Sequence, residues 1–278
     1  MTLWYNFLSL LPFEWLQYEF MKNALLAVII VTPLLGLLGT MVVNNKMAFF
    51  SDSLGHSALT GIGIGVLAGF QNPLGSMIIF AVAMAIGITY LKNVTKFSPD
   101  TIIGVFASTA VALGIVILSR NGGFNHYSKF LIGDILSIAP KEITAVGFVF
   151  LAVMVFWIFF FNELLIVSIN PALARSRGIS TFKLETVFTI LVAVVVTVAI
   201  QWVGLLVINS LLILPAAAAR NLAANMKSYH LIAVGISIFS GLFGLVLSYY
   251  WGTATGATIV LCSAVIFFLT LLGRRVKG

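Results

Sequence analysis

One carboxylate and one imidazole lie four residues apart in an otherwise apolar part of the chain. The residues are Asp52 and His56, within the segment from Phe49 to Gly61. On a helix, this spacing places both side chains on the same face, about one turn apart. Ionisable side chains are costly to place inside a membrane, so they typically mark the path of a substrate, an ion or a proton. The pair is therefore the first candidate for chemistry in this sequence.

The pair is suited to three roles. A carboxylate and a neutral imidazole are acceptable ligands for Zn²⁺, Mn²⁺ and Fe²⁺. A structural zinc site uses about four ligands, whereas a transport site must release its ion and can use fewer, with water completing the shell. The same two groups could instead relay protons, or form a hydrogen-bonded pair with a structural role. The residues alone leave all three alternatives open.

Membrane-spanning helices are the elements expected to carry this pair. Of 278 residues, 61% are hydrophobic and only 8% are charged, against about a quarter charged in soluble domains. Several apolar stretches reach the roughly 20 residues that a helix needs to cross a bilayer. The alternating pattern of a transmembrane barrel is absent, and backbone polar groups must be satisfied within lipid. The fold class is therefore all-α, that of a polytopic membrane protein.

The apolar runs predict eight or nine transmembrane helices in a single domain that covers residues 1–278. Residues 1–20 contain Trp, Tyr and Glu and are expected to lie at the membrane interface. The run at 208–222 is short and contains Pro215, which predicts a broken or re-entrant helix. The expected spans are 23–43, 49–70, 73–91, 101–119, 142–161, 186–207, 208–222, 229–250 and 254–273.

Positive charge indicates the orientation of the chain and not a nucleic-acid partner. The net charge is +7, and the 15 Lys and Arg residues lie mainly in short loops and at the C-terminal end. Basic residues follow every odd-numbered span, which the positive-inside rule assigns to the cytoplasm. The loop at 120–141 is then expected to face outward, and the region 162–185 is expected to face the cytoplasm.

The region 162–185 carries the signals of a short helix. Asn170 is suited to cap a helix that begins at Pro171, and Gly178 is suited to end it. Arg175 and Arg177 would lie on or next to this helix. A short basic helix between two spans is suited to docking on a soluble partner.

Two residues of the outward loop are further candidate metal ligands. Asp134 could handle metal near the outer mouth, or it could be an ordinary turn residue. His126 could receive metal, or it could be an exposed histidine without a role. The single Cys262 lies in an apolar run and indicates packing, because no thiolate cluster is present.

The sequence does not have the motifs of an enzyme. It contains no glycine-rich phosphate loop with Lys and Ser or Thr, no His-Glu-x-x-His and no nucleophile elbow. Catalysis by this chain is not expected. Uphill transport would need an ion gradient or a separate energy-converting subunit.

Three segments together resemble the permease subunit of the metal-ion ABC importers, which bring zinc, manganese or iron into bacteria. They run from Phe50 to Gly61, from Ile169 to Ala174, and from Val203 to Arg220, the last ending in Pro-Ala-Ala-Ala-Ala-Arg. The segment Gly133-Asp134-Ile135-Leu136 also fits, and the match runs over nearly the whole chain. Within the family, the sequence is most similar to the high-affinity zinc permeases.

The resemblance implies a homodimer in the bacterial cytoplasmic (inner) membrane, with two ATP-binding cassette subunits and an extracytoplasmic metal-binding protein. ATP belongs to the partner subunit, and no permanently bound cofactor is expected. Asp52 and His56 become the metal-handling pair on an alternating-access path. The short cytoplasmic helix becomes the ATPase-coupling segment, with the residues Asn170, Pro171, Ala172, Leu173, Ala174, Arg175, Arg177 and Gly178.

The implied cargo is zinc, with manganese or iron as alternatives, because the Asp/His pair accepts all three ions. A proton-coupled secondary transporter would use the pair as a relay and need no ATPase, and a membrane scaffold would tolerate its loss. Two positions depart from the family pattern. Ser51 stands where relatives usually have Gly, and Thr60 where they often have Pro or Leu; neither change removes a ligand.

Overall fold

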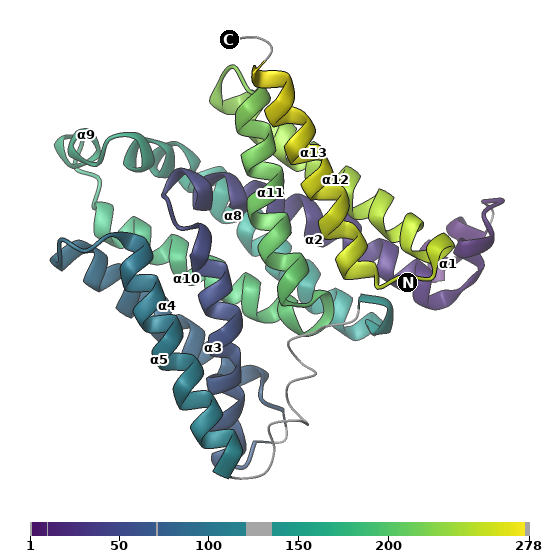
Figure 1. Cartoon of the computed structure of the whole chain (residues 1–278), viewed down its shortest axis with the longest axis horizontal. Helices are drawn as coiled ribbons and strands as arrows, with labels where there is room; N and C mark the ends of the chain where they lie inside the picture. Colours follow the sequence, from purple (N-terminus) through teal and green to yellow (C-terminus); the bar gives the residue numbers. More distant parts are fainter. Residues whose placement is uncertain (1, 10, 71, 121–134, 276–278) are drawn as a thin grey trace. The chain divides into compact units, whose positions relative to one another are not determined.

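The structure is a computed structural model of the chain, and it describes residues 2–9, 11–70, 72–120 and 135–275. The regular elements in these ranges are helices, so the all-α prediction is confirmed (Figure 1). The two 3₁₀ helices are η1 (Glu14–Gln17) and η2 (Ile135–Ser137). The α-helices are α1 (Thr2–Ser9), α2 (Glu19–Asn44), α3 (Ala48–Leu67), α4 (Leu74–Val94), α5 (Pro99–Arg120), α8 (Pro140–Ile169), α9 (Pro171–Ser176), α10 (Thr181–Val203), α11 (Leu205–Leu222), α12 (Met226–Trp251) and α13 (Thr255–Arg275).

Among the described residues, 7 helices are long and apolar enough to cross a membrane, namely α2, α4, α5, α8, α10, α12 and α13. The other two expected spans correspond to α3 and α11. With 20 residues, α3 is about 30 Å long and could also cross a bilayer, but it carries many polar side chains. The multi-pass prediction is thus confirmed, and the two remaining helices are the less apolar ones.

The prediction of a helix broken at Pro215 is wrong, because α11 continues through this residue, whereas the re-entrant alternative stays a prediction. The chain instead breaks at Gly204, which separates α10 from α11 and has a φ of 84°. Glycine adopts this backbone conformation without the steric penalty that a Cβ brings. The helix boundary expected between residues 207 and 208 therefore lies a few residues earlier, at Gly204. The sequence does not mark it, because the residues around it are apolar.

The helices form two compact units, each built from both halves of the sequence. The first unit comprises Met1–Thr40, Asp134–Ala152 and Trp202–Gly278, and the second comprises Met41–Gly133 and Val153–Gln201. Most of α2 thus belongs with α11, α12 and α13, whereas most of α10 belongs with α3, α4 and α5. Each group of three consecutive helices is completed by a helix from the other half of the chain.

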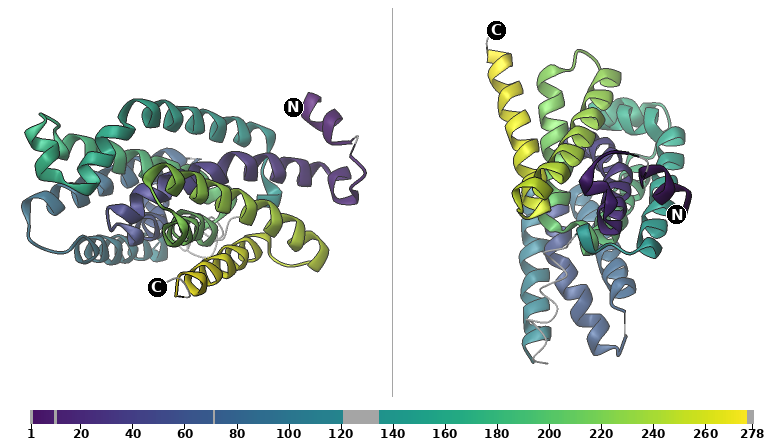
Figure 2. Two further views of the ribbon diagram at one scale, coloured as in Figure 1. Left: turned by 90° about the horizontal axis from the view of Figure 1, so that it is seen from above. Right: turned by 90° about the vertical axis from the view of Figure 1, so that its right-hand side faces the viewer.

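In the first unit, α11, α12 and α13 pack against one another, and most of α2 belongs to the same unit. The Ser237 hydroxyl donates a hydrogen bond of 2.7 Å to the Thr32 carbonyl, which connects α12 to α2. Gly39 of α2 leaves no room for a Cβ beside the Leu212 backbone of α11. Gly252, whose φ is 62°, ends α12. Figure 2 shows the turn that follows it, between the yellow-green α12 and the yellow α13.

In the second unit, α3 packs on both α4 and α5 (Figure 1). A Cβ at Gly61 would lie 2.6 Å from the Met77 Cα, and a Cβ at Gly114 would lie 2.8 Å from the Thr60 nitrogen. The Thr60 hydroxyl donates to the Ala110 carbonyl and so links α3 to α5. Small residues allow helix backbones to approach closely in lipid. These glycines therefore hold α3 between its neighbours.

Gly114→Ala is expected to destabilise the protein by about 1–3 kcal/mol, because the new methyl group would push α5 away from the α3 backbone. Gly104→Ala is the matched control in the same helix, because no heavy atom lies within 4 Å of its would-be Cβ. That variant should be as stable as the parent or up to about 1 kcal/mol more stable, since Ala favours helix. Thermal unfolding in detergent would measure both, and equal melting temperatures would contradict the close packing.

Candidate metal site and coupling segment

Asp52 and His56 lie on the same face of α3, as their spacing predicted. His56 Nε2 is 3.6 Å from Asp52 Oδ2, and each side chain is 44% exposed. This is an ion-pair distance when the imidazole is protonated, and a neutral imidazole would present a lone pair beside the carboxylate oxygen. The pair can therefore offer one nitrogen and one or two oxygens to a cation.

The burial pattern of α3 distinguishes this pair from the rest of the helix. From Phe50 to Gly63, every residue is buried except Asp52 and His56. The helix is packed on its other faces by neighbours that include α4 and α5. The two ionisable side chains thus occupy the accessible strip of an otherwise buried helix. A structural pair with no external ligand would not require this accessibility.

The serines around the pair belong to the packed part of α3. The Ser53 and Ser57 hydroxyls donate hydrogen bonds of 2.8 Å to the carbonyls of Phe50 and Leu54, one turn earlier. Ser51 is fully buried, and its helical backbone has no need of the glycine that relatives usually have. The departures at Ser51 and Thr60 therefore leave the geometry of the pair intact.

The other candidate ligands do not complete a site in the part of the chain that the structure describes. No group of three or more His, Cys, Asp or Glu side chains occurs there. His126 and Asp134 lie outside the described residues. His230 belongs to the first unit, where its Nδ1 is 2.6 Å from the Met226 carbonyl oxygen. Within the described residues, Asp52 and His56 therefore form a candidate site of two protein ligands.

The predicted short helix is present as α9, which spans Pro171–Ser176. The Asn170 side chain caps it by accepting hydrogen bonds of 3.0 Å and 3.1 Å from the Ala172 and Leu173 backbone nitrogens. Gly178 follows with a φ of 78°, which ends the turn. The buried Ala174 anchors the helix. Its other residues are exposed, namely Pro171, Ala172, Leu173, Arg175 and Ser176, as is Arg177 directly after it.

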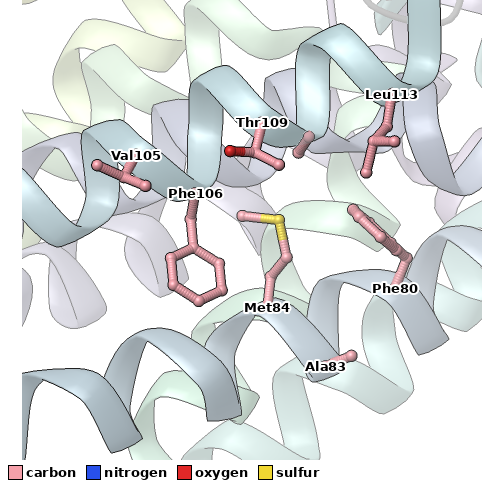
Figure 3. Close-up of a pocket in the computed structure, with 8 residues that line it drawn as sticks. Phe80, Ala83, Met84, Val105, Phe106, Thr109 and Leu113 are labelled. Carbon is pink, nitrogen blue, oxygen red and sulfur yellow. The ribbon is translucent and has the colours of Figure 1, made fainter. Parts of the chain in front are cut away.

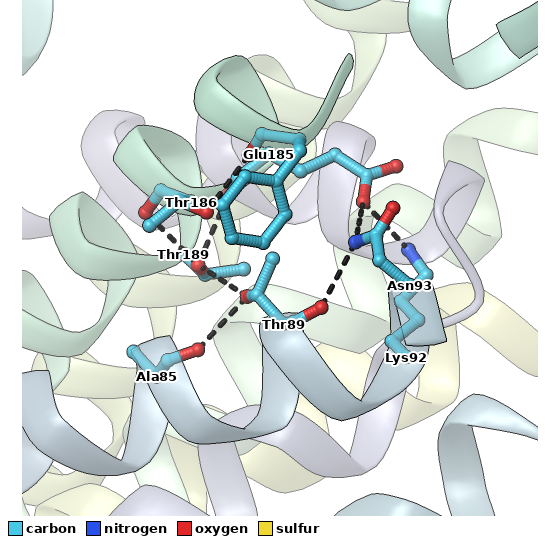
Figure 4. A network of polar contacts seen from close by, with 8 residues as sticks. Ala85, Thr89, Lys92, Asn93, Glu185, Thr186 and Thr189 are labelled. Atoms are coloured by element: carbon cyan, nitrogen blue, oxygen red, sulfur yellow. Dashed lines mark hydrogen bonds and ion pairs between the residues drawn. The ribbon is translucent and has the colours of Figure 1, made fainter. Parts of the chain in front are cut away.

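A polar network between α4 and α10 was not anticipated from the sequence (Figure 4). Glu185 Oε2 lies 3.5 Å from the Lys92 ammonium and accepts a hydrogen bond of 3.4 Å from Asn93. One turn further on, the Thr89 and Thr189 hydroxyl oxygens are 2.9 Å apart, and both residues are buried. The charged and hydroxyl contacts together join α4 to α10.

The two threonine hydroxyls lie within hydrogen-bond distance of more acceptor oxygens than their two protons can serve. Thr89 Oγ1 is 2.8 Å from the Ala85 carbonyl, and Thr189 Oγ1 is 3.0 Å from the carbonyls of Glu185 and Thr186. Each hydroxyl has a single proton to donate. When one threonine donates to the other, its bond to its own helix is lost. The pair can therefore alternate between two hydrogen-bond arrangements.

A cavity of about 330 Å³ between α4 and α5 offers no second metal site (Figure 3). Thr109 is the only residue with a polar side chain in its lining. Transition metals bind nitrogen, sulfur or carboxylate ligands, and the lining offers only the single thioether of Met84. The remaining lining residues are Phe80, Ala83, Met84, Val105, Phe106, Ala110 and Leu113.

Comparison with known proteins agrees with this architecture. The model of the ABC 3 transport family matches residues 17–274. The chain belongs to this family. The high-affinity zinc uptake system membrane protein ZnuB of Haemophilus influenzae is 36% identical over 261 residues, covering 93% of this chain and 99% of that protein. The manganese import system permease protein ScaB of Streptococcus gordonii is 30% identical over 270 residues, covering 94% and 96%.

Among solved structures, PsaBC from Streptococcus pneumoniae in complex with Fab matches with a TM-score of 0.78. Its identity is 28%, and the match covers 97% of this chain and 95% of that one. The chain is thus the permease component of a metal-ion ABC importer. It is a multi-pass protein of the bacterial cytoplasmic membrane. The resemblance inferred from the three motifs is confirmed. Zinc and manganese proteins both occur among the relatives.

Proposed function

We propose that this permease is the membrane subunit of an ATP-driven zinc importer. The observation that carries the proposal is the Asp52/His56 pair, whose atoms are 3.6 Å apart on the accessible strip of a buried helix. A nitrogen and a carboxylate oxygen are common ligands of Zn²⁺. The 36% identity to a protein named as a zinc permease supports zinc as the cargo.

The ion is held by few protein ligands and is released easily. One copy offers Asp52 and His56, and water would complete the coordination of an ion in transit. In a homodimer, two copies would bring two such pairs to a shared path, which makes four protein ligands. An ion held by imidazoles binds only while they are neutral, so affinity falls in acid.

We assign α9 to docking on a separate ATP-binding subunit, so that ATP hydrolysis there would move the permease through this helix. Exposed side chains of α9, Arg175 among them, would contact that subunit, while an extracytoplasmic binding protein delivers the metal. The chain leads directly from α9 into α10, and the network at Glu185 joins α10 to α4. Because α4 packs on α3, movement of α9 would reach the helix that carries the metal pair.

Manganese is the second candidate cargo, and the 30% identity to a manganese permease favours it. Carboxylate ligands suit Mn²⁺, and zinc binds most nitrogen and oxygen sites more tightly without thereby being the cargo. Uptake must therefore be measured with each ion separately.

The test is uptake of radioactive zinc and manganese by liposomes that contain the permease, its ATP-binding subunit and the binding protein. We expect ATP-dependent zinc uptake with little manganese uptake. Manganese uptake without zinc uptake would keep the transporter class and replace the cargo. Uptake that needs a proton gradient and no ATP would overturn the ATP-driven mechanism.

A further inference from the structure

A cavity of about 380 Å³ in the second unit has an apolar part and a charged rim. It lies between the C-terminal half of α8 and the start of α10, directly after the coupling segment. The apolar side chains are Phe156, Phe160, Ile179, Leu184 and Val187, and the remaining lining residues are Glu163, Arg177, Gly178, Ser180 and Lys183.

The apolar part opens on a face of α8 that is suited to lipid. The rings of Phe156 and Phe160 stack with their centroids 5.0 Å apart. Phe160 and Val187, which line the cavity, are themselves 40% and 47% exposed. In a membrane protein, such large exposed apolar side chains contact acyl chains. A hydrocarbon chain can therefore reach the cavity from the bilayer.

The charged rim carries two cations and one anion. Arg177 and Lys183 are exposed and Glu163 is half-buried. Neither of the ion pairs within the described ranges involves any of the three, since those pairs are Asp52 with His56 and Lys92 with Glu185. The positive end of the α10 dipole also lies here, because the helix begins at Thr181. The rim thus offers donors for a phosphate and one acceptor for an ammonium.

We propose that this cavity binds a phospholipid with an ethanolamine headgroup. Arg177 and Lys183 hold the phosphate diester, Glu163 accepts hydrogen bonds from the primary ammonium, and an acyl chain covers Phe156 and Phe160. Both charges of the headgroup then find an opposite charge on the rim. A choline headgroup has no N–H to donate to Glu163, and a glycerol headgroup has no positive charge. A free phosphate would leave the apolar part unused.

The position of the cavity gives the lipid a role in coupling. Arg177 directly follows α9, so a lipid held by its side chain would fix the end of the coupling segment at the membrane surface. This consequence rests on the proposed function of α9. The binding itself does not, and it is therefore measured without transport.

The test is thermal unfolding and native mass spectrometry of the full chain in neutral detergent with added lipids. A ligand that binds the folded state raises the melting temperature. Phosphatidylethanolamine should raise it more than phosphatidylcholine or phosphatidylglycerol, and should stay bound in the gas phase. Arg177→Gln/Lys183→Gln should weaken its binding about thirtyfold, given the usual contribution of a basic side chain near lipid phosphate.

Two further variants make the test specific. Glu163→Gln should abolish the preference for ethanolamine over choline while anionic lipid still binds. Lys96→Gln/Lys227→Gln removes the same charge outside the cavity and should leave the melting-temperature shift unchanged. Equal shifts with all three lipids, a shift that survives Arg177→Gln/Lys183→Gln, or an equal shift with soluble glycerophosphoethanolamine would each overturn the proposal.

Discussion

Alanine at both Asp52 and His56 is expected to reduce ATP-driven zinc uptake to background while the protein still folds. Each single substitution should lower uptake at limiting zinc by at least about tenfold, because metal affinity depends strongly on ligands and their immediate partners. Each side chain is 44% exposed, so its removal leaves no closed cavity. The free energy of unfolding should change by no more than about 0.5 kcal/mol.

Uptake of radioactive zinc into the reconstituted liposomes measures this effect. Asp100→Ala is the control, because Asp100 is an exposed carboxylate at the start of α5. It should transport zinc at the parent rate. Full uptake by a folded Asp52→Ala/His56→Ala variant would show that the pair does not handle the metal.

Equilibrium dialysis separates a metal site from a proton relay. If the pairs of two copies share one ion, the purified permease should bind about one zinc for every two chains. Asp52→Asn keeps the size of the side chain but removes its charge, and it should lower this binding. Unchanged zinc binding together with lost transport would instead favour a relay.

Glu185→Gln is expected to uncouple ATP hydrolysis from zinc uptake. The substitution removes the charge that faces Lys92 and leaves that ammonium half-buried without its partner. Leaving one member of such a pair behind costs about 1–3 kcal/mol, more than the pair itself contributes. The link from α10 to α4 would loosen, so the zinc moved per ATP hydrolysed should fall several-fold while hydrolysis continues.

The measurement is the ratio of zinc transported to ATP hydrolysed in the same liposomes. Lys92→Met/Glu185→Gln should recover part of the lost stability, because no unpaired charge then remains. Thr186→Val is the control within α10, because its hydroxyl donates only to the Phe182 carbonyl of its own helix. A parent ratio in Glu185→Gln would exclude a coupling role for the network.

The buried hydroxyl pair provides an independent check of the same link. Thr89→Val and Thr189→Val each remove one oxygen of the 2.9 Å contact and preserve side-chain shape. If the contact joins the helices, the two effects on the ratio should be non-additive in the double variant. Strictly additive effects would mean that the threonines act separately.

Much of the fold was predictable because lipid imposes simple rules on sequence. Apolar runs of spanning length must become helices, and each of the nine expected spans contains one. The Asp52/His56 pair followed from helical periodicity alone. The N-cap at Asn170 and the helix end at Gly178 also depend on local backbone chemistry, so both could be predicted from the sequence.

What the sequence did not reveal depends on contacts between distant segments. Glu185 contacts Asn93, which lies 92 residues earlier in the chain, and the neighbouring Lys92. No local sequence pattern pairs residues that are so far apart. The break at Gly204 lies inside a continuous apolar run, where no polar residue marks a boundary. The burial of α3 also depends on its neighbours α4 and α5, which the sequence of α3 does not identify.

The exchange of α2 and α10 between the two units has a consequence for synthesis at the ribosome. The unit that contains α2 can form only after α11, α12 and α13 have been synthesised. Until then, α2 lies in the membrane without the helices it packs with. The group of α3, α4 and α5 likewise waits for α10. Neither half of the chain contains all the helices of a unit, so a nascent or truncated half would remain unfinished and exposed to quality-control proteases.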